Sequence, residues 1–439
     1  MDDQGRVVVL HGVNAVWKRS PYLPPATAAG FTERDAQWLA DHHFNTVRLG
    51  VIFAGVMPRE GRVDQRYLDG VERLVRMLAR HRIWVMLDFH QDMFNERFGG
   101  EGFPAWAVHD DGLPTPVQLG FPANYFQPST SRAFDNLYAN TAGVADHYAV
   151  AWRAVAKRFR DVPYVMGYDL INEPWPGTQA ATCANPVGCP AFEAQQLAPF
   201  YLKLIRAIRS VDRRHLVWVE PQVLFNFGAG STLSGLADPQ LGFSFHEYCL
   251  PASLTHASGG QAGPECHQLG DLVFRNAEQE ATENGWTSLL TEFGASDDLA
   301  DLADVTGLAE QYLVGWQYWH YKEWDDPTTE SQESGGQGMF TDDADLSSVK
   351  RAKLRILERP FPRATAGRPL SWESPAPGVV WFRWESAQGV TEVVLPRSHY
   401  PRGYDVQLTG GRVVSRPGAD VLRIRTIGAG TAQLRVTPK

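Results

Sequence analysis

The chain has 439 residues, of which 44% are hydrophobic and 21% charged, a composition typical of a globular protein with a large core. Its 41 Lys plus Arg against 50 Asp plus Glu give a formal net charge of -9. This acidity argues against a nucleic-acid partner, because phosphate recognition favours a basic face. No apolar run approaches the roughly 20 residues that a membrane-spanning helix needs.

Four cysteines form two local pairs, Cys183 with Cys189 and Cys249 with Cys266. Each pair lies in a loop rich in Pro, Gly and Ser, which favours short-range disulfides formed outside the cytosol. A metal site and free thiols are the alternatives, although neither pair has CxxC spacing. The N-terminal stretch MDDQGRVVVLHG lacks the pattern of a secretory signal. We expect a secreted protein whose signal is not part of this chain.

Eight apolar, β-branched segments recur along the chain, and most of them end in polar or charged residues. Near-continuous apolar strands are typical of a parallel sheet covered by helices on both faces. The segments are residues 7–15, 45–51, 83–90, 164–174, 215–221, 241–248, 287–294 and 315–322. Helical spacing of apolar residues appears between most of them, for example over 66–81, 152–159 and 200–211. This alternation predicts an α/β fold with a (β/α)8 TIM barrel over residues 1–358.

The pattern changes after residue 358. The stretch ERPFPRATAGRP is rich in proline and indicates a linker. Beyond it, short segments with alternating apolar and polar residues are separated by turns, at 379–385, 391–396, 404–409, 412–416, 421–427 and 432–437. This pattern predicts a small C-terminal antiparallel β-sandwich domain over residues 359–439.

Polar residues at the C-terminal ends of barrel strands face the active site in this type of fold. The predicted strand ends carry Arg48, Asp88, His90, Asp92, Asn172, Glu173, Glu220, His246, Tyr248, Glu292 and Trp319. A single Glu or His at such a position is more often a loop or wall residue, and a single Trp is more often core. Structural roles would scatter these residues over both ends of the barrel, so their gathering at one end predicts an active site.

Two of these carboxylates, Glu173 and Glu292, follow strands on opposing sides of the predicted barrel mouth. Glycoside hydrolysis needs such a pair, because one carboxyl protonates the departing oxygen while the other attacks the sugar or activates water. We expect Glu173 to be protonated and Glu292 to be ionised, with Arg48 and Tyr248 favouring the charge on Glu292. Asn172 could hydrogen-bond the sugar 2-hydroxyl.

The remaining strand-end residues suit roles around this pair. His90 and His246 could bind hydroxyls or tune the acid, and Trp319 offers a flat apolar face for a pyranose ring. The DFHQD stretch clusters carboxylates with one His but lacks an HExxH or similar metal-binding pattern. We therefore expect no metal and no cofactor.

The strand-end residues, together with the NEP of 172–174, the HEY of 246–248 and the TEFG around Glu292, resemble glycoside hydrolase family five. The segments HGVNAVWKRSPY, LDFHQDMF, GGEGFPAWA and YDLINEPWPG look more narrowly like the endoglycoceramidases of that family. These enzymes cleave the β-linkage between an oligosaccharide and ceramide. The resemblance implies that Glu173 is the acid/base, that Glu292 is the nucleophile and that configuration is retained.

The same resemblance implies that Lys18, Asp88, Gln91 and Asp92 line the sugar subsites. It also implies an apolar channel for the lipid, for which residues 91–106 and the Cys249–Cys266 loop are candidates. The function expected is a retaining endo-β-glycosidase for glycosphingolipids, acting as a monomer in transient contact with a membrane or micelle surface.

Other functions stay open at this point. The same chemistry would suit a β-glucosidase for simple lipid or sterol glucosides, or a polysaccharide endoglucanase. A non-catalytic glycolipid-binding protein, with the β-sandwich as binding module, belongs to a different class. The presence of both carboxylates counts against it. Whether the first sugar is glucose or galactose is not fixed by the sequence.

Overall fold

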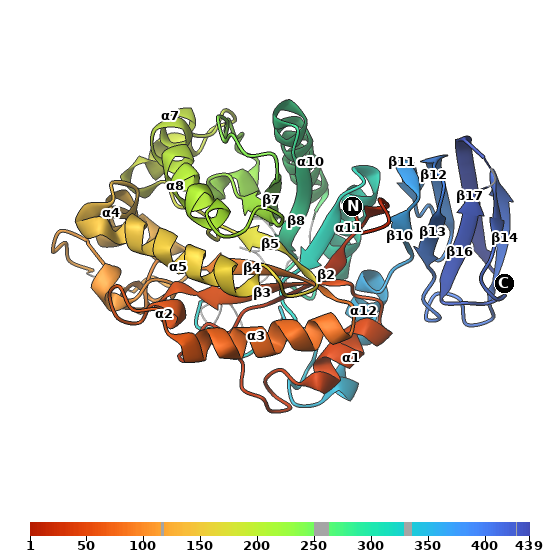
Figure 1. The fold of residues 1–439 in the computed structure, drawn as a ribbon, viewed down its shortest axis with the longest axis horizontal. Helices are drawn as coiled ribbons and strands as arrows, with labels where there is room; N and C mark the ends of the chain where they lie inside the picture. The colour runs from red at the N-terminus through yellow and green to blue at the C-terminus, as the bar shows by residue number, and fades with distance from the viewer. Residues whose placement is uncertain (116–117, 250–262, 329–335, 427) are drawn as a thin grey trace.

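The computed structural model describes residues 1–115, 118–249, 263–328, 336–426 and 428–439. Eight parallel strands close into a barrel in chain order, which confirms the predicted TIM-barrel fold (Figure 1). They are β2 (His11–Ala15), β3 (Thr46–Ile52), β4 (Trp84–His90), β5 (Val165–Asp169), β6 (Leu216–Val219), β7 (Leu241–Glu247), β8 (Thr287–Phe293) and β9 (Gly315–Tyr318).

Helices surround this barrel. They are α1 (Glu33–Asp41), α2 (Phe53–Val56), α3 (Gln65–Arg80), α4 (Pro128–Tyr138), α5 (Val144–Phe159), α6 (Ala180–Cys183), α7 (Pro190–Phe192), α8 (Ala198–Arg209), α10 (Pro264–Asn284), α11 (Leu299–Gln311) and α12 (Arg351–Leu357). In α3, the Asp64 side chain caps the helix by accepting the backbone N–H groups of Arg66 and Tyr67. Its apolar residues recur at helical spacing and are buried.

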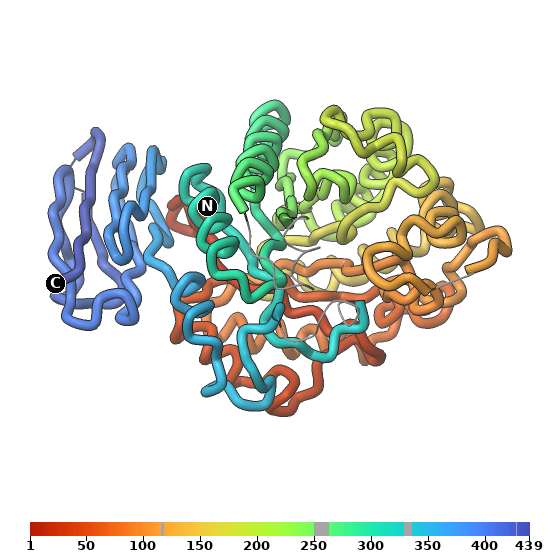
Figure 2. The backbone as a smooth tube through the Cα atoms, turned by 180° about the vertical axis from the view of Figure 1, so that it is seen from behind, coloured from red at the N-terminus to blue at the C-terminus, as the bar shows by residue number. Residues whose placement is uncertain are grey.

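The C-terminal residues and the N-terminal strand β1 form two antiparallel sheets, which lie at one end of the molecule (Figure 2). One sheet has the order β1-β10-β13-β16-β15, and the other has the order β11-β12-β17-β14. The strands are β1 (Val7–Val8), β10 (Phe361–Thr365), β11 (Gly367–Glu373), β12 (Val380–Ser386), β13 (Val390–Val394), β14 (Tyr404–Thr409), β15 (Gly411–Val413), β16 (Val421–Thr426) and β17 (Gly430–Pro438). In β12, Phe382 and Trp384 are buried between the sheets while Trp381 and Arg383 point outward, as the alternating pattern requires.

Two details of the predicted organisation are wrong. The proline-rich stretch is no linker, because β10 and the first part of β11 lie within it. Pro362 is tolerated in β10 because the pairing with β13 is irregular between Phe361 and Ala364. The segment 7–15 is not one strand either, since β1 pairs with β10 in the sandwich whereas β2 starts the barrel. The side chain of Asn45 stabilises the two residues between these strands, because it accepts a hydrogen bond from the backbone N–H of His11 and donates one to the carbonyl of Val9.

The barrel and the sandwich share an apolar contact around His11. The buried imidazole stacks against Trp316 of the barrel, with ring centroids 4.3 Å apart, and against Phe361 of the sandwich at 4.0 Å. Arg359 adds an ion pair of 2.6 Å to Glu310 of α11. The predicted boundary at residue 358 therefore falls between α12 and β10, in a segment that packs on both parts.

Candidate active site

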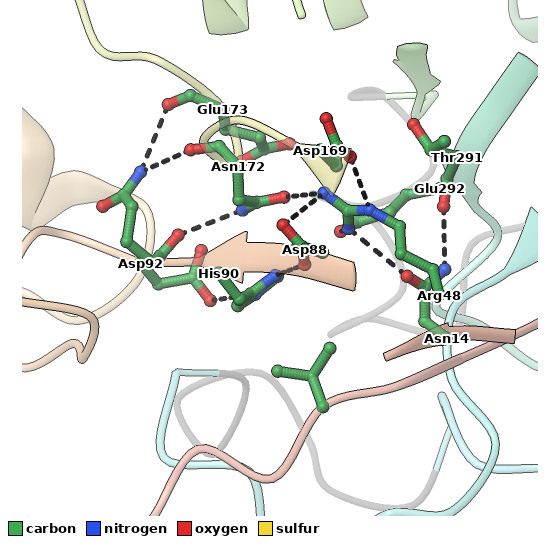
Figure 3. A network of polar contacts seen from close by, with 12 residues as sticks. Asn14, Arg48, Asp88, His90, Asp92, Asp169, Asn172, Glu173, Thr291 and Glu292 are labelled. Atoms are coloured by element: carbon green, nitrogen blue, oxygen red, sulfur yellow. Dashed lines mark hydrogen bonds and ion pairs between the residues drawn. The ribbon is translucent and has the colours of Figure 1, made fainter. Parts of the chain in front are cut away.

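Arg48 is the third of the seven residues of β3, and not at the strand end as predicted, and its fully buried side chain lies among the polar residues of the barrel mouth (Figure 3). Its guanidinium donates to Asp169 and Glu220 at 2.9 Å each and to Glu292 at 2.5 Å, and it forms an ion pair of 3.1 Å with Asp88. Burial alone would lower the pKa of Arg48, but these four carboxylates raise it well above its ordinary value. Arg48 is therefore a fixed cation that binds carboxylates from four separate parts of the barrel.

Glu292 lies near the end of β8 and has a donor on each oxygen. Oε1 accepts from Arg48, and Oε2 accepts from the hydroxyl of Tyr248 at 2.9 Å. The Nδ1 atom of His246 is 3.6 Å from Oε2. The predicted contacts of Arg48 and Tyr248 with this carboxylate are thus present, and such donors hold a negative charge in place.

Glu173 lies beyond its strand, because β5 ends at Asp169 and not near residue 174 as predicted. Its backbone φ is 43°, in the left-handed region that non-glycine residues rarely adopt. The backbone N–H of Glu173 donates to Glu220 Oε2 at 2.8 Å, and its side-chain Oε1 receives Asn226 Nδ2 at 2.6 Å and His246 Nδ1 at 2.9 Å. These contacts direct the carboxyl group back toward the barrel mouth.

The two glutamates are close together. One carboxylate oxygen of Glu173, one of Glu292 and a ring nitrogen of His246 all lie within 4.8 Å of one another. Carboxyl groups about 5–5.5 Å apart suit a retaining glycosidase, whereas inversion needs about 6.5–9.5 Å. Burial raises the pKa of Glu173, and the negative Glu292 adds to this effect while His246 opposes it. The raised pKa therefore suits Glu173 to hold a proton, as an acid catalyst must.

A second polar group extends from the mouth next to Trp319. The ammonium of Lys18 is 2.5 Å from Asp92 and 3.1 Å from Asp326, and it donates to the hydroxyl of Thr328 at 2.8 Å. The same ammonium lies 4.6 Å from the centroid of the Trp319 ring. This combination of a flat aromatic face with charged hydrogen-bonding groups suits sugar hydroxyls. It includes the predicted subsite residues Lys18 and Asp92.

His90 lies against Trp319, whereas Asp88 lies behind His90 and pairs with Arg48. His90 stacks on Trp319 with ring centroids 5.2 Å apart. Asp88, expected to line a sugar subsite, is fully buried between Arg48 and His90, whose Nδ1 is 2.8 Å from it. Burial opposes the charged form of His90, but Asp88 and then Asp92 raise its pKa to about 10.

Gln91, which the resemblance places in a sugar subsite, binds protein groups at both ends of its side-chain amide. Its amide nitrogen donates to the backbone carbonyl of Asn172 at 2.8 Å, and its amide oxygen accepts the N–H of Phe94 at 2.9 Å. Asn172 in turn accepts from Arg48 at 2.9 Å and donates to the carbonyl of Gln91 at 3.0 Å. Gln91 therefore supports the backbone beside Glu173.

The structure adds residues that sequence reasoning left without a role. Glu220 links Arg48 to the backbone of Glu173, although only its strand-end position was apparent. Asn14 of β2 accepts from Arg48 at 3.3 Å and donates to the carbonyl of Thr291 at 2.8 Å. Asn14 and Asp169 lie near the ends of their strands, so the strand-end rule could have found them. Asn226 lies in the 3-10 helix η7 (Val223–Phe227) after β6, where no such signal exists.

Two sets of three buried side chains have the donor types of a metal site, namely Glu173–His246–Glu292 and His90–Asp92–Glu101. A cationic side chain already pairs with a carboxylate in each set, Arg48 in the first and Lys18 in the second. These ion pairs compete with metal binding, because the guanidinium of Arg48 and the ammonium of Lys18 already bind carboxylate oxygens that a metal ion would need as ligands. A site without metal or cofactor stays our prediction.

Three of the four aromatic residues of 91–106 are buried in the core, and only Trp106 of the expected apolar channel wall is partly exposed. Phe94, Phe98 and Phe103 are all buried in the core, and the rings of Phe94 and Phe103 stack 4.0 Å apart. These three phenylalanines are therefore core residues, and the channel wall stays a prediction for Trp106. The other candidate, the Cys249–Cys266 loop, lies mostly outside the described residues.

Both predicted disulfides are present. Cys183–Cys189 has its Cα atoms 4.5 Å apart, and Cys249–Cys266 has them 5.2 Å apart. No free cysteine occurs among the described residues. The oxidised state agrees with the extracellular setting inferred from the sequence.

Removing either disulfide should lower the free energy of unfolding. Chain-entropy arguments give about 2 kcal/mol for the Cys183–Cys189 loop and about 3 kcal/mol for the longer Cys249–Cys266 loop. Urea unfolding of the two double Cys→Ser variants measures both values. Dithiothreitol should destabilise the wild type and leave a variant lacking both disulfides unchanged. An equal stability of oxidised and reduced wild type would contradict this expectation.

A (β/α)8 barrel with two carboxylic acids this close at its mouth defines the class of glycoside hydrolases. Residues 1–324 match Cellulase (glycosyl hydrolase family 5), and residues 359–437 match the glycoside hydrolase family 5 C-terminal domain. The chain belongs to glycosyl hydrolase family 5, as its motifs predicted.

Relatives of known name cover nearly the whole chain. Endoglycoceramidase I of Rhodococcus hoagii (strain 103S) is 34% identical over 99% of this chain and 86% of its own length. An endoglycoceramidase of Cyanea nozakii is 28% identical over 85% of this chain and 76% of its own. Among solved structures, endo-glycoceramidase II from Rhodococcus sp. has a TM-score of 0.82 and 32% identity as its lactosyl-enzyme intermediate, covering 100% of this chain and 99% of that chain. Its complex with ganglioside GM3 has a TM-score of 0.81 and 32% identity, with 100% and 98% covered.

Proposed function

We propose that this protein is a retaining endo-β-glycosidase that hydrolyses the bond between the oligosaccharide and the ceramide of glycosphingolipids. The observation that carries the proposal is the pairing of Glu173 with Glu292, whose carboxylate oxygens approach within 4.8 Å beside the Lys18–Trp319 group. Similarity to endoglycoceramidases over almost the full chain supports the choice of substrate.

The reaction proceeds by double displacement. Glu292 attacks the anomeric carbon of the first sugar, while Glu173 gives its proton to the glycosidic oxygen, so that ceramide leaves as a neutral alcohol. Water then attacks the glycosyl–Glu292 ester. Glu173 takes a proton from this water, which frees the glycan with its configuration retained and restores both carboxyl groups.

Product analysis tests the proposal. Lactosylceramide incubated with the protein should give intact lactose and ceramide by mass spectrometry. Release of galactose before glucose would contradict endo action. Rates on glucosylceramide and on soluble cello-oligosaccharides measure the competing β-glucosidase and endoglucanase activities, and either rate exceeding that on lactosylceramide would replace our assignment.

The pH dependence of kcat/KM should reflect the raised pKa of Glu173. An acid catalyst acts only while it is protonated, so activity should persist above the usual pKa range of a glutamic acid and fall as pH rises through the raised value. We expect the basic limb of an alkyl lactoside profile to disappear in Glu173→Gln. A wild-type profile that is flat from pH 4 to 9 would contradict the assignment.

We also propose that the protein acts as a secreted monomer that touches the lipid surface with loops beyond β4 and β5. Among the described residues, no helix is long and apolar enough to cross a membrane. Leu119, Phe126 and Val187 on these loops are each 62% exposed. Phe126 packs edge-on against Trp175, with ring centroids 4.8 Å apart. Trp175 lies two residues after Glu173 in the chain. Such exposed apolar side chains suit a membrane interface.

A single substitution tests this contact. Phe126→Ser should lower the rate on lactosylceramide in phosphatidylcholine vesicles by about 5- to 10-fold, because one buried aromatic contact of about 1–1.5 kcal/mol is lost. The rate on a soluble aryl lactoside should stay the same. Val413→Ser, on the exposed edge strand β15 of the sandwich, is the control and should change neither rate.

A further inference from the structure

The two oxygens of the Glu173 carboxyl group have different surroundings. Oε1 receives Asn226 Nδ2 at 2.6 Å and His246 Nδ1 at 2.9 Å. Oε2 takes part in no hydrogen bond with any residue that the structure describes. Because the two donors converge on one oxygen, the carboxyl group is chemically asymmetric before any substrate binds.

His246 can act as a donor on both ring nitrogens. Its Nδ1 lies against Glu173, and its Nε2 lies 3.5 Å from Glu220 Oε1. Burial disfavours the charged ring, but Glu220 and Glu292 raise the pKa of His246 well above its ordinary value. An imidazolium in this place presents an N–H to Glu173 Oε1, beside the N–H of Asn226.

We propose that Asn226 is a positioning residue that, together with His246, keeps the catalytic proton of Glu173 on Oε2. A proton on Oε1 would point toward two N–H donors, which is unfavourable, whereas a proton on Oε2 leaves Oε1 as an acceptor for both. Oε2 is then the oxygen that delivers the proton to the glycosidic oxygen. The inference rests on the proposed role of Glu173 as acid/base.

The loop that carries Asn226 is anchored independently of Glu173. At its start, the Gln222 side chain accepts the N–H of Leu224 at 2.9 Å. At its end, Glu193 accepts the N–H of Thr232 at 2.6 Å. Asn276 of α10 donates to the carbonyl of Gly228 at 3.4 Å. The buried Asn226 side chain is therefore held in place by its loop, as a positioning role requires.

The test compares two leaving groups that need different amounts of acid catalysis. Asn226→Asp keeps the side-chain shape but replaces the N–H donor with an acceptor, which would draw the Glu173 proton to Oε1. We expect kcat/KM for octyl β-lactoside to fall by about 30-fold or more, a part of the 10²- to 10⁴-fold that general acid catalysis supplies. For 2,4-dinitrophenyl β-lactoside, whose leaving group needs no proton, we expect a change of less than about 3-fold.

Three further variants complete the design. Asn226→Ser removes the donor at this distance without adding a charge and should show the same selectivity in a weaker form. Glu173→Gln provides the full selectivity of a missing acid. Asn276→Ala, which loosens the same loop without touching Glu173, should affect both lactosides equally. The dinitrophenyl rate also reports whether each variant is folded.

Equal losses on the two lactosides in Asn226→Asp, or no loss on either, would overturn the inference. Both lactosides are soluble, so the comparison is independent of the lipid substrate. A wild type that cleaves the lactosides but not lactosylceramide would refute the proposed lipid specificity and leave the inference about Asn226 intact. A wild type inactive on both lactosides would refute both.

Discussion

Replacing Glu292 with glutamine should reduce kcat/KM on lactosylceramide by about 10⁴-fold or more, the order of loss seen when a catalytic nucleophile is removed. The amide of glutamine cannot form the glycosyl ester. It also places an NH2 group or a neutral oxygen where Arg48 and Tyr248 now donate to a carboxylate. Steady-state release of ceramide by wild type and variant measures the loss.

The neighbouring Glu247 provides a matched control. It follows His246 on β7, is also buried, and lies near Gly270 of α10 on the outer side of the barrel. Because alternate residues of a strand face opposite sides, Glu247→Gln should keep activity close to that of the wild type. If Glu292→Gln retained more than about a hundredth of the wild-type rate, the nucleophile would have to be sought elsewhere.

Replacing Arg48 with methionine should destabilise the fold by about 3–5 kcal/mol, the cost of leaving buried charges without their partner. The guanidinium contacts Asp88, Asp169, Glu220 and Glu292 at once, so its removal leaves four buried carboxylates without the cation that binds them all. The free energy of unfolding, measured in urea, should recover partly as pH falls and these carboxylates take up protons.

Arg158 is the control for this prediction. It also bridges two carboxylates, those of Asp69 and Glu72, but it lies at the surface with 30% of its side chain exposed. Arg158→Met should therefore lower the free energy of unfolding by less than about 1 kcal/mol.

Arg48→Lys should be as inactive as Arg48→Met, because an ammonium cannot reproduce the several directed bonds of the guanidinium. A cost of under about 1 kcal/mol for Arg48→Met would refute the central role of this cation.

The barrel and most of its mouth could be predicted from the sequence. Parallel strands buried on both faces require continuous apolar segments, and the ends of such strands must gather at one edge of the barrel. For this reason Arg48, His246 and Glu292, which are far apart in the chain, were expected together, and the structure brings them together.

Other features depend on tertiary contacts that leave no local pattern. The ERPFPRATAGRP stretch has the composition of a linker, but the irregular pairing of β10 with β13 tolerates Pro362 within a sheet. The resemblance assigned Asp88 and Gln91 to the sugar subsites, but it could not show that Asp88 pairs with Arg48 and His90 or that Gln91 binds the backbone of Asn172 and Phe94. Asn226 reaches Glu173 from a loop, and no periodicity or motif predicts where a loop side chain points.

The pairing of β1 with β10 makes the barrel an insertion within the sandwich, because Val7 lies opposite Thr365 and all eight barrel strands come between them. The larger sheet cannot be completed until the chain has been synthesised past β16, which ends at Thr426. A protein cut after residue 358 would lose the partner of β1 and uncover His11 and Trp316 at the base of the barrel. We therefore expect the barrel and the sandwich to unfold together, because the β1–β10 pairing and the contacts of His11 join them.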